Sequence, residues 1–353
     1  MATMCSYKRI AVVGTGGYGW HFLQALARSN YFEKVRAVTR KSGIDDKEKR
    51  ARIRALRELG VEVVEYEDKT ADAFGQAFAD IDIVLSAVGL AGVLEQIPMI
   101  DGAIQAGVRW FIPSEFGVAH YSSVWMPFKC PLAAKSTIEQ YLAEKARPKG
   151  LAYTIVYTGL ALDYLDPRSL GLKVNKNAAT LVGRGGTPIT FTAIADVIRL
   201  VVEIVQRPKE MQNRTIRYAG STDKLRDLVK IVTKSDRGVN VKIVCIEEAK
   251  AKFCELARQQ DMQAFSIYCR LLLEEGLGQI NRHGEPLDNK LFPDICPEPV
   301  QQTLCRLMKS SDAELEQIKK HSAKRVATAI SVTDGLGQMH HPGTGNLSDV
   351  ESA

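Results

Sequence analysis

Close to the N-terminus the sequence runs Ile10-Ala11-Val12-Val13-Gly14-Thr15-Gly16-Gly17-Tyr18-Gly19. Apolar residues lead into a turn of the form G-x-G-x-x-G, and a helix with an apolar face follows. In such a turn the first glycine allows a tight bend, the second lets backbone N–H groups approach a pyrophosphate, and the third lets the helix pack closely on the sheet. The phosphate then meets the unpaired N–H groups and the positive dipole end of the helix. The turn therefore predicts a dinucleotide site, whose cofactor-binding residues are Gly14, Thr15, Gly16, Gly17, Tyr18 and Gly19.

Strands and helices alternate as far as residue 157. After the first strand, others are predicted at 34–40, 61–64, 81–89, 108–113 and 151–157. Helices are predicted between them and beyond, at 45–60, 71–79, 94–106, 133–146, 194–205, 224–233, 246–259, 262–275 and 313–319. Alternation at this spacing is typical of a doubly wound parallel sheet of the Rossmann type. The predicted fold class is therefore α/β, with a smaller C-terminal substrate lobe where the pattern loosens beyond Gly159.

The expected domain limits follow from where this pattern changes. Thr192 precedes the helix expected at 194–205 and is a candidate N-cap. Residues 331–353 are rich in Gly, Ser, Thr and His without apolar periodicity, so we expect a disordered tail there. We expect a dinucleotide-binding domain at 1–160 with a return segment at about 188–222, and a substrate lobe made of 161–187 and 223–330.

Composition limits the function classes. The 353 residues are 45% hydrophobic and 25% charged, as in ordinary soluble globular proteins. There is no run of about 18 apolar residues and no stretch typical of a secretory signal, so we expect a cytoplasmic protein without a membrane partner. The seven cysteines are scattered without a C-x-x-C pair, and the six histidines lack ligand spacing. Neither a disulfide framework nor a metal site is indicated.

The charge balance suits an anionic cofactor better than a nucleic acid. The net charge of +6 comes from 47 basic and 41 acidic residues, which is a mild excess. The basic residues between Lys34 and Arg57 are interleaved with acids and have no stacking platform among them. A nucleic-acid partner is therefore not expected.

The second predicted strand ends in Val38-Thr39-Arg40-Lys41. A site selective for NAD usually has Asp or Glu here, where the carboxylate accepts hydrogen bonds from the ribose hydroxyls. A carboxylate would repel a 2′-phosphate, whereas the Arg40 guanidinium can bind it with paired charge-assisted hydrogen bonds. The sequence therefore predicts NADPH as the cofactor. A solvated charged face with i,i+4 pairs such as Glu48 with Arg52 accounts for most of the bases that follow, which are Lys47, Lys49, Arg50, Arg52 and Arg54.

A resemblance to a known family lies in the segment Arg109-Trp110-Phe111-Ile112-Pro113-Ser114-Glu115-Phe116-Gly117. It resembles the R-F-F-P-S-E-F-G segment of the isoflavone reductase-like proteins, a group within the NmrA-like atypical short-chain dehydrogenases. The likeness continues in Leu151-Ala152-Tyr153-Thr154-Ile155-Val156 and in the spacing from Arg40 to Lys49, as far as about residue 220. It implies a Rossmann domain with a smaller substrate lobe, reductase activity with NADPH, and 2′-phosphate ligands at Arg40 and Lys49. The likeness also includes Ser86, Ala87, Val88 and Gly89, which we add to the predicted cofactor-binding residues.

The resemblance also indicates a lysine on the helix before the sixth strand. The matching residue is Lys135, in the register of the lysine in the superfamily's Y-x-x-x-K motif. The tyrosine position of that motif is Pro131, so proton transfer falls to the lysine, to water or to the substrate. A competing Tyr141-x-x-x-Lys145 lies too close to the sixth strand to align, so we interpret Tyr141 as packing and Lys145 as surface. Lys135 is the predicted catalytic residue, which hydrogen-bonds the nicotinamide ribose and assists proton transfer.

The fifth strand ends with Ser114 and Phe116, at the carboxyl edge where ligands of open α/β folds bind. We expect both to contact the cofactor, with the Phe116 ring near the nicotinamide. The next loop contains His120, Tyr121 and Trp125, which either line an apolar mouth for an aromatic substrate or anchor the loop to the core. This loop departs from the acidic continuation of the plant reductases, which removes support for a lignan or isoflavonoid substrate.

Two functions remain open. The first is an NADPH-dependent reductase that transfers a hydride to a small, aromatic or conjugated organic acceptor, with Lys135 as the orienting and proton-transfer residue. The second is a non-catalytic redox sensor, as in the NmrA branch, which binds NAD(P) and a protein partner. Either function is compatible with a homodimer.

Overall fold

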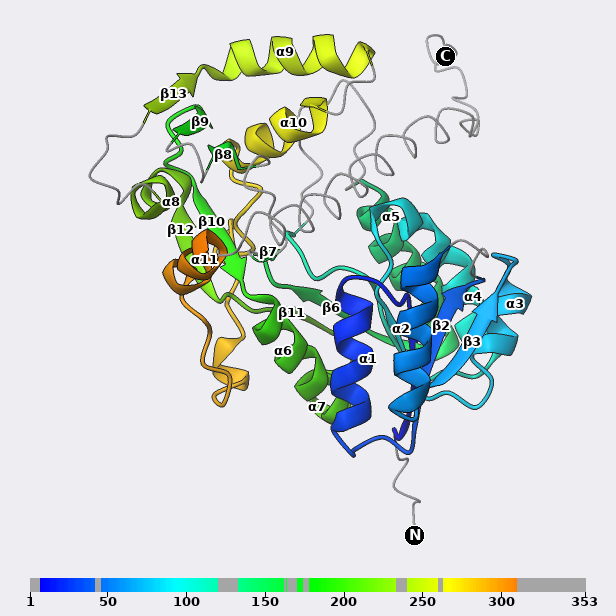
Figure 1. The fold of residues 1–353 in the computed structure, drawn as a ribbon. Coiled ribbons are helices and arrows are strands. Elements are labelled where there is room, and N and C mark those ends of the chain that lie inside the picture. Colours follow the sequence, from blue (N-terminus) through cyan, green and yellow to red (C-terminus); the bar gives the residue numbers. More distant parts are fainter. Residues whose placement is uncertain are drawn as a thin grey trace, which may run out of the picture.

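The computed structural model describes residues 7–41, 46–119, 133–161, 163, 170–173, 178–232, 240–259 and 263–309. At its centre lies a sheet in which every neighbouring pair of strands is parallel (Figure 1). The strand order is β11 (Arg214–Arg217), β6 (Ala152–Tyr157), β5 (Trp110–Ile112), β4 (Ile83–Ser86), β1 (Arg9–Val13), β2 (Lys34–Arg40) and β3 (Glu62–Tyr66). The order changes direction between β1 and β4, the kind of switch point at which ligands of such sheets bind. The predicted doubly wound sheet is confirmed.

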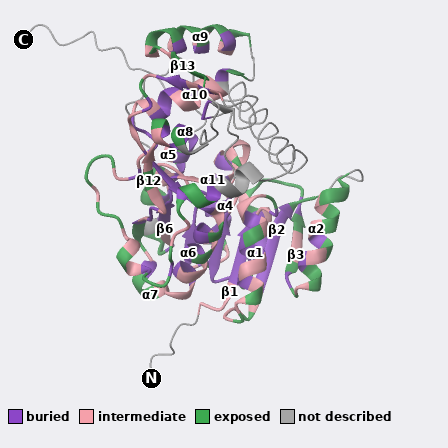
Figure 2. Cartoon of the chain, turned by 60° about the vertical axis from the view of Figure 1, so that its left-hand side comes forward, coloured by how far each residue is buried: buried purple, intermediate pink, exposed green. Residues whose placement is uncertain are grey.

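Helices cover both faces of this sheet. They are α1 (Tyr18–Arg28), α2 (Lys47–Glu58), α3 (Ala71–Ala77), α4 (Gln96–Gln105), α5 (Ala133–Tyr141), α6 (Ile194–Gln206) and the short α7 (Pro208–Met211). Side chains alternate along β1, so Ile10 and Val12 pack with α1, α2 and α6, whereas Ala11 and Val13 pack with α3, α4 and α5. Figure 2 shows the strands buried between these two layers, while α2 exposes its outer side.

The start of α6 differs from the sequence prediction. Thr192 does not cap this helix, because its hydroxyl donates to the Thr158 carbonyl at 2.6 Å and accepts from the Gly220 N–H at 3.0 Å. The N-cap is the next residue, which has no capping side chain. Instead, the Asp163 carboxylate accepts from the Ile194 N–H at 2.8 Å. A side chain from a distant segment therefore satisfies one N–H group of the first turn.

The remaining described chain contains two small sheets. One has the order β12 (Ser221–Lys224), β10 (Pro188–Thr192) and β7 (Leu160–Ala161). The other has the order β13 (Asn240–Val244), β9 (Ala178–Val182) and β8 (Leu172–Lys173). They pack with α8 (Leu225–Val232), α9 (Ile246–Arg258), α10 (Gln263–Glu274) and α11 (Val300–Lys309). The sequence predicted the first three of these helices but none of these strands, and the domain limits stay a prediction. The helix predicted at 313–319 and the tail at 331–353 lie outside the described residues.

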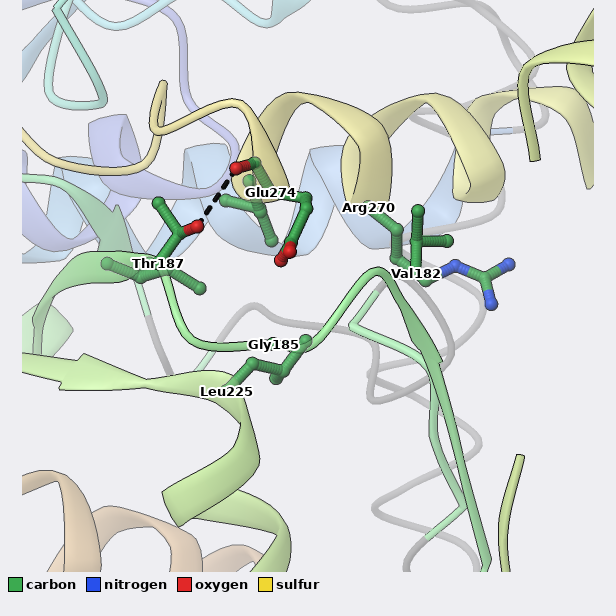
Figure 3. A pocket seen from close by; sticks show the side chains of 8 residues that line it. Val182, Gly185, Thr187, Leu225, Arg270 and Glu274 are labelled. Atoms are coloured by element: carbon green, nitrogen blue, oxygen red, sulfur yellow. Dashed lines mark hydrogen bonds between the residues drawn. The ribbon is translucent and has the colours of Figure 1, made fainter. Parts of the chain in front are cut away.

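A small pocket lies in this second part of the molecule (Figure 3). On one side Thr187 donates to the Glu274 carbonyl oxygen of α10 at 2.9 Å. In the figure the Arg270 guanidinium points away from Thr187. The labelled lining residues all belong to this part rather than to the glycine turn, and they are Val182, Gly185, Thr187, Leu225, Arg270 and Glu274.

The chain then returns to the parallel sheet. Asp288 accepts from the Arg217 N–H at 2.8 Å, at the end of β11. Asn289, in the short 3-10 helix Asn289–Leu291, accepts from the Ala219 N–H at 3.1 Å and donates to the Ala219 carbonyl at 2.8 Å. Further on, the Glu298 N–H donates to the buried carboxylate of Asp196 on α6 at 2.8 Å. Residues 288–298 thus fasten the end of β11 and the start of α6.

Asn289→Ala is expected to lower the free energy of unfolding by about 1–3 kcal/mol, because it leaves both backbone groups of buried Ala219 without this partner. Chemical denaturation measures the change. The matched control is Asn240→Ala at an exposed position, which should stay within about 0.5 kcal/mol of the parent. Equal effects of the two substitutions would show that the Asn289 contacts are not stabilising.

Candidate functional site

The glycine turn is packed so tightly that two of its positions admit no side chain. Gly14 has φ +105°, and a Cβ there would lie 2.8 Å from the Ala87 carbonyl oxygen. A Cβ on Gly19 would lie 2.1 Å from the Gly14 carbonyl oxygen. Backbone hydrogen bonds keep the turn close to the neighbouring strands. The Gly14 N–H donates to the Val38 carbonyl at 2.9 Å, and the Ala87 N–H donates to the Val13 carbonyl at 2.9 Å. The turn therefore fixes α1 against the carboxyl ends of β1, β2 and β4.

The middle of the same turn is open. Gly16 is exposed, and a Cβ built there would meet one described neighbour within 4 Å, the Arg52 Nη1 at 3.7 Å. Gly17 is the N-cap of α1, and no side chain in the described part of the chain caps this helix. The N–H groups at the start of α1 therefore face space that a phosphate can occupy. This arrangement fits the pyrophosphate of a dinucleotide.

Basic side chains of β2 and α2 lie beside the turn, which is linked to the end of β2 by the Thr15 and Thr39 hydroxyls at 3.3 Å. Arg40 is exposed at this strand end, and the Lys49 ammonium donates to its carbonyl oxygen. Burial lowers the pKa of Lys49, and the positive charge of Arg40 adds to this shift. The structure thus brings the two predicted phosphate ligands together.

Arg52 is a further candidate ligand that the sequence analysis assigned to a charged surface. Its expected pair with Glu48 is present. The same guanidinium nevertheless borders Gly16, on the open side of the turn. Its spacing of three residues from Lys49 places both on one face of α2, and this signal could have found it.

The carboxyl ends of β4 and β5 meet beside the turn. Ser114 joins them, because its hydroxyl donates to the Val88 carbonyl at 2.8 Å and its N–H donates to the Gln96 side-chain oxygen at 2.8 Å. Ser86 is buried, and its hydroxyl has no hydrogen-bond partner within the described ranges. The predicted segment from Ser86 to Gly89 therefore borders the turn, and its contact with a cofactor stays a prediction.

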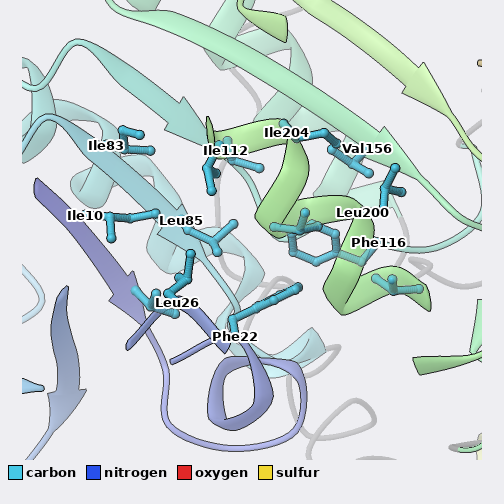
Figure 4. Packing of buried hydrophobic residues seen from close by; sticks show 14 of the residues in the cluster. Ile10, Phe22, Leu26, Ile83, Leu85, Ile112, Phe116, Val156, Leu200 and Ile204 are labelled. Atoms are coloured by element: carbon cyan, nitrogen blue, oxygen red, sulfur yellow. The ribbon is translucent and has the colours of Figure 1, made fainter. Parts of the chain in front are cut away.

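Phe116 follows β5 with an unusual backbone, at φ +27°. Its ring is 5% exposed and lies in the core on the α1 side of the sheet (Figure 4). The ring centroid is 5.2 Å from that of Phe22 and 5.8 Å from that of Tyr18. The ring thus supports the first turn of α1, and the expected contact with nicotinamide stays a prediction.

Lys135 extends from α5 to the loop that follows β5. Its ammonium donates to the Glu115 carbonyl oxygen at 2.7 Å and lies 3.5 Å from the Glu115 carboxylate. The Lys135 side chain is 11% exposed, and that of Glu115 is fully buried. The helix itself ends at Tyr141, earlier than the predicted limit of 146, and continues as a π-helical turn, Leu142–Ala146. Lys135 therefore reaches the same sheet edge as the glycine turn, through an ion pair that the sequence did not predict.

Glu139 and Tyr157 form a second pair that the sequence analysis missed. The Tyr157 hydroxyl donates to Glu139 Oε1 at 2.5 Å. Burial raises the pKa of Glu139 to about 7, and the nearby Glu115 carboxylate contributes to this increase. Burial also raises the pKa of Tyr157 above its usual value. The i,i+4 spacing of Glu139 from Lys135 is the sequence signal for this group.

Several predicted residues lie elsewhere or outside the described residues. His120, Tyr121, Trp125 and Pro131 belong to the range 120–132, which is not described. The Tyr141 hydroxyl donates to Asp101 at 2.7 Å and Lys145 is exposed, which confirms their interpretation as packing and surface residues. Within the described ranges, no group of three His, Cys, Asp or Glu side chains is arranged to bind a metal, and no helix has the length and apolarity to cross a membrane.

Comparisons with known proteins agree with this architecture. A model of the NmrA-like family matches residues 6–300. Isoflavone reductase homolog P3 of Arabidopsis thaliana is 26% identical over 236 residues, which cover 66% of this chain and 74% of the relative. The structure of AtPrR2 with NADP+ and (+)pinoresinol has a TM-score of 0.71 at 19% identity and covers 84% of this chain and 97% of that one. The structure of leucoanthocyanidin reductase of Vitis vinifera with NADPH has a TM-score of 0.70 at 18% identity. The match covers 86% of this chain and 100% of that one.

Two glycine substitutions separate packing from binding. Gly19→Ala should lower the free energy of unfolding by about 1–3 kcal/mol or more, because its Cβ overlaps the Gly14 carbonyl. Gly16→Ala should leave stability almost unchanged, since its Cβ points into open space, but should weaken NADPH binding by filling that space. Denaturation and calorimetric titration measure the two effects. Unchanged NADPH affinity in Gly16→Ala would contradict the assignment of the open side to the cofactor.

Proposed function

Because the chain belongs to the NmrA-like family, we propose that it is an NADPH-dependent reductase that transfers a hydride to a small aromatic or conjugated organic acceptor. The observation that carries this proposal is the position of buried Lys135 at the end of β5, on the edge where the glycine turn opens. β1, β4 and β5 are consecutive parallel strands, so their carboxyl ends form one edge. A dinucleotide along this edge would reach both features.

The proposed cofactor residues divide by chemistry. The glycine turn and the start of α1 would bind the pyrophosphate, while Arg40, Lys49 and Arg52 would bind the 2′-phosphate and its neighbours. The loops after β4 and β5 would border the nicotinamide half, with Ser86 and Ser114 among their polar groups. The similar solved structures contain NADP+ or NADPH, which supports this choice of cofactor. When bound, the reduced nicotinamide supplies the hydride.

Lys135 would orient the nicotinamide ribose and transfer a proton. An ammonium has three N–H donors, and the Glu115 carbonyl takes one of them. The Glu115 carboxylate, at 3.5 Å, holds the positive charge in place although the side chain is largely buried. The remaining donors can serve a ribose hydroxyl and the acceptor. This division of donors gives the lysine a fixed position and a proton to transfer.

The acceptor would lie between the sheet edge and the second part of the molecule. In this proposal, residues 1–160 with 188–222 bind the cofactor, and 161–187 with 223–330 form the substrate lobe. His120, Tyr121 and Trp125, which lie outside the described residues, are the proposed substrate contacts. A solved structure of similar fold contains (+)pinoresinol, which supports a small aromatic acceptor as a class but not a lignan in particular. No feature of the described ranges favours the alternative of a redox sensor with a protein partner.

The proposal predicts that the protein oxidises NADPH with at least one member of a panel of quinones, enals and phenylpropanoid ethers. Lys135→Ala should lower kcat about 100-fold or more, because it removes the proton-transfer group. NADPH absorbance measures turnover, and calorimetry checks that the variant still binds the cofactor. The control Lys145→Ala, at an exposed position, should keep full activity. Tight NADPH binding without turnover of any acceptor would refute the reductase function.

Arg40→Ala should raise the Kd for NADPH about 10–100-fold and leave the Kd for NADH unchanged, because the guanidinium is proposed to bind only the 2′-phosphate. Calorimetric titration with both cofactors measures this preference. Lys47→Ala, which removes an exposed charge from the start of the neighbouring helix α2, is the control. An equal loss of affinity for NADPH and NADH in Arg40→Ala would place Arg40 away from the 2′-phosphate.

A further inference from the structure

Behind Lys135 lies a set of buried and half-buried ionisable groups, here called the α5 cluster: Glu115, Lys135, Glu139, Tyr157 and Arg217. Lys135 and Glu139 are one turn apart and therefore on the same face of α5. Tyr157 ends β6 and Arg217 ends β11, and these two residues are register partners in the sheet. Three elements and one loop thus direct charged or titratable groups into one region.

The α5 cluster contains two carboxyl groups, and among the described residues only one of them has a cation within 4 Å. Glu115 pairs with Lys135 at 3.5 Å. Within the described residues, the hydrogen-bond partner of Glu139 is the neutral hydroxyl of Tyr157, at 2.5 Å. Two ionised carboxylates near each other in a buried region are unfavourable, so one of them keeps its proton to a higher pH than usual. The pairing identifies Glu139 as the group that keeps it.

Building on the proposed reductase function, we propose that Glu139 stores the proton that restores Lys135 after each transfer to the acceptor, with Tyr157 as its positioning residue. The Lys135 ammonium gives a proton to the acceptor that has received the hydride, which leaves a neutral amine. The O–H bond of the Glu139 carboxylic acid then breaks, and an N–H bond forms on Lys135. Bulk water returns a proton to the Glu139 carboxylate before the next cycle.

The positive charge of Arg217 stabilises the ionised form of Glu139. The Arg217 guanidinium carbon lies 5.6 Å from the centre of the Tyr157 ring, and its buried Nε has no hydrogen-bond partner among the described residues. The Nη2 of the same guanidinium lies 3.9 Å from the Glu285 carboxylate, and the positive charge of Arg217 favours the ionised form of Glu139. The Tyr157 hydroxyl continues to donate to the same oxygen. The α5 cluster therefore accommodates both protonation states of Glu139.

The first test is infrared titration of the protein without an acceptor. Wild type minus Glu139→Gln should show a carboxylic acid C=O band at pH 6 that disappears as the pH rises through about 7. The control Glu144→Gln changes an exposed residue in the following π-helical turn. Its own spectrum should contain the same carboxylic acid band as wild type, with the same loss as the pH rises. Absence of the band at pH 6 overturns the inference, whether or not the protein is active.

The second test is the pH dependence of kcat. In wild type kcat should fall about tenfold from pH 6 to pH 8, as a group titrating near 7 loses its proton. Glu139→Gln should have a lower kcat that is flat over this range, and Tyr157→Phe should move the fall to higher pH, because the lost hydrogen bond stabilised the carboxylate. A Glu139→Gln variant that keeps the wild-type profile overturns the inference. Normal infrared titration without any turnover overturns the reductase function instead.

Discussion

The close approach of α1 to the ends of β1 and β4 is the constraint on which the rest of the structure depends. Gly19 lies so near the Gly14 carbonyl that even a methyl group would collide with it. This contact sets where the positive end of α1 meets the sheet edge. The adjoining β2 brings Arg40 to the same edge, and Lys49 of α2 donates to the Arg40 carbonyl oxygen. Phe116 packs beneath the start of the helix and ties the loop after β5 to it. One tight backbone contact therefore aligns the groups of the candidate site.

The sequence predicted six of the seven strands of the parallel sheet, because each of these six has a local signal, whereas β11 was not predicted. Apolar strands, glycine ends and amphipathic helices follow one another as far as Tyr157, and strand limits differ from those observed by a few residues. β8 and β13 had no comparable signal, since β8 has two residues and β13 is largely exposed. Their positions depend on pairing with β9 rather than on their own residues. Thr192 was misassigned because a capping residue and a strand residue that binds two distant backbone groups look alike in sequence.

The candidate site was predictable where a motif carries its chemistry. The glycine turn, the basic end of β2 and Lys135 all follow from spacing or from the family resemblance. Glu115 and Glu139 could not be singled out in this way, because the behaviour of a carboxyl group depends on its burial and neighbours. Glu139 meets Tyr157 across 18 residues of sequence, and both contact the region of Glu115 only after β5, α5 and β6 have packed together. The local sequence around either residue does not predict a contact that forms only in the folded protein.

The return of residues 288–298 to the sheet bears on how the chain is made. During synthesis β1 to β6 leave the ribosome first, yet the end of β11 and the start of α6 need Asp288, Asn289 and Glu298 as backbone partners. The parallel sheet and its helices therefore begin to form first, but these hydrogen bonds form only after residues 288–298 have been added. Removal or exchange of residues 288–298 would leave these groups of β11 and α6 without their protein partners, so the N-terminal part cannot be separated at this point as an independent module.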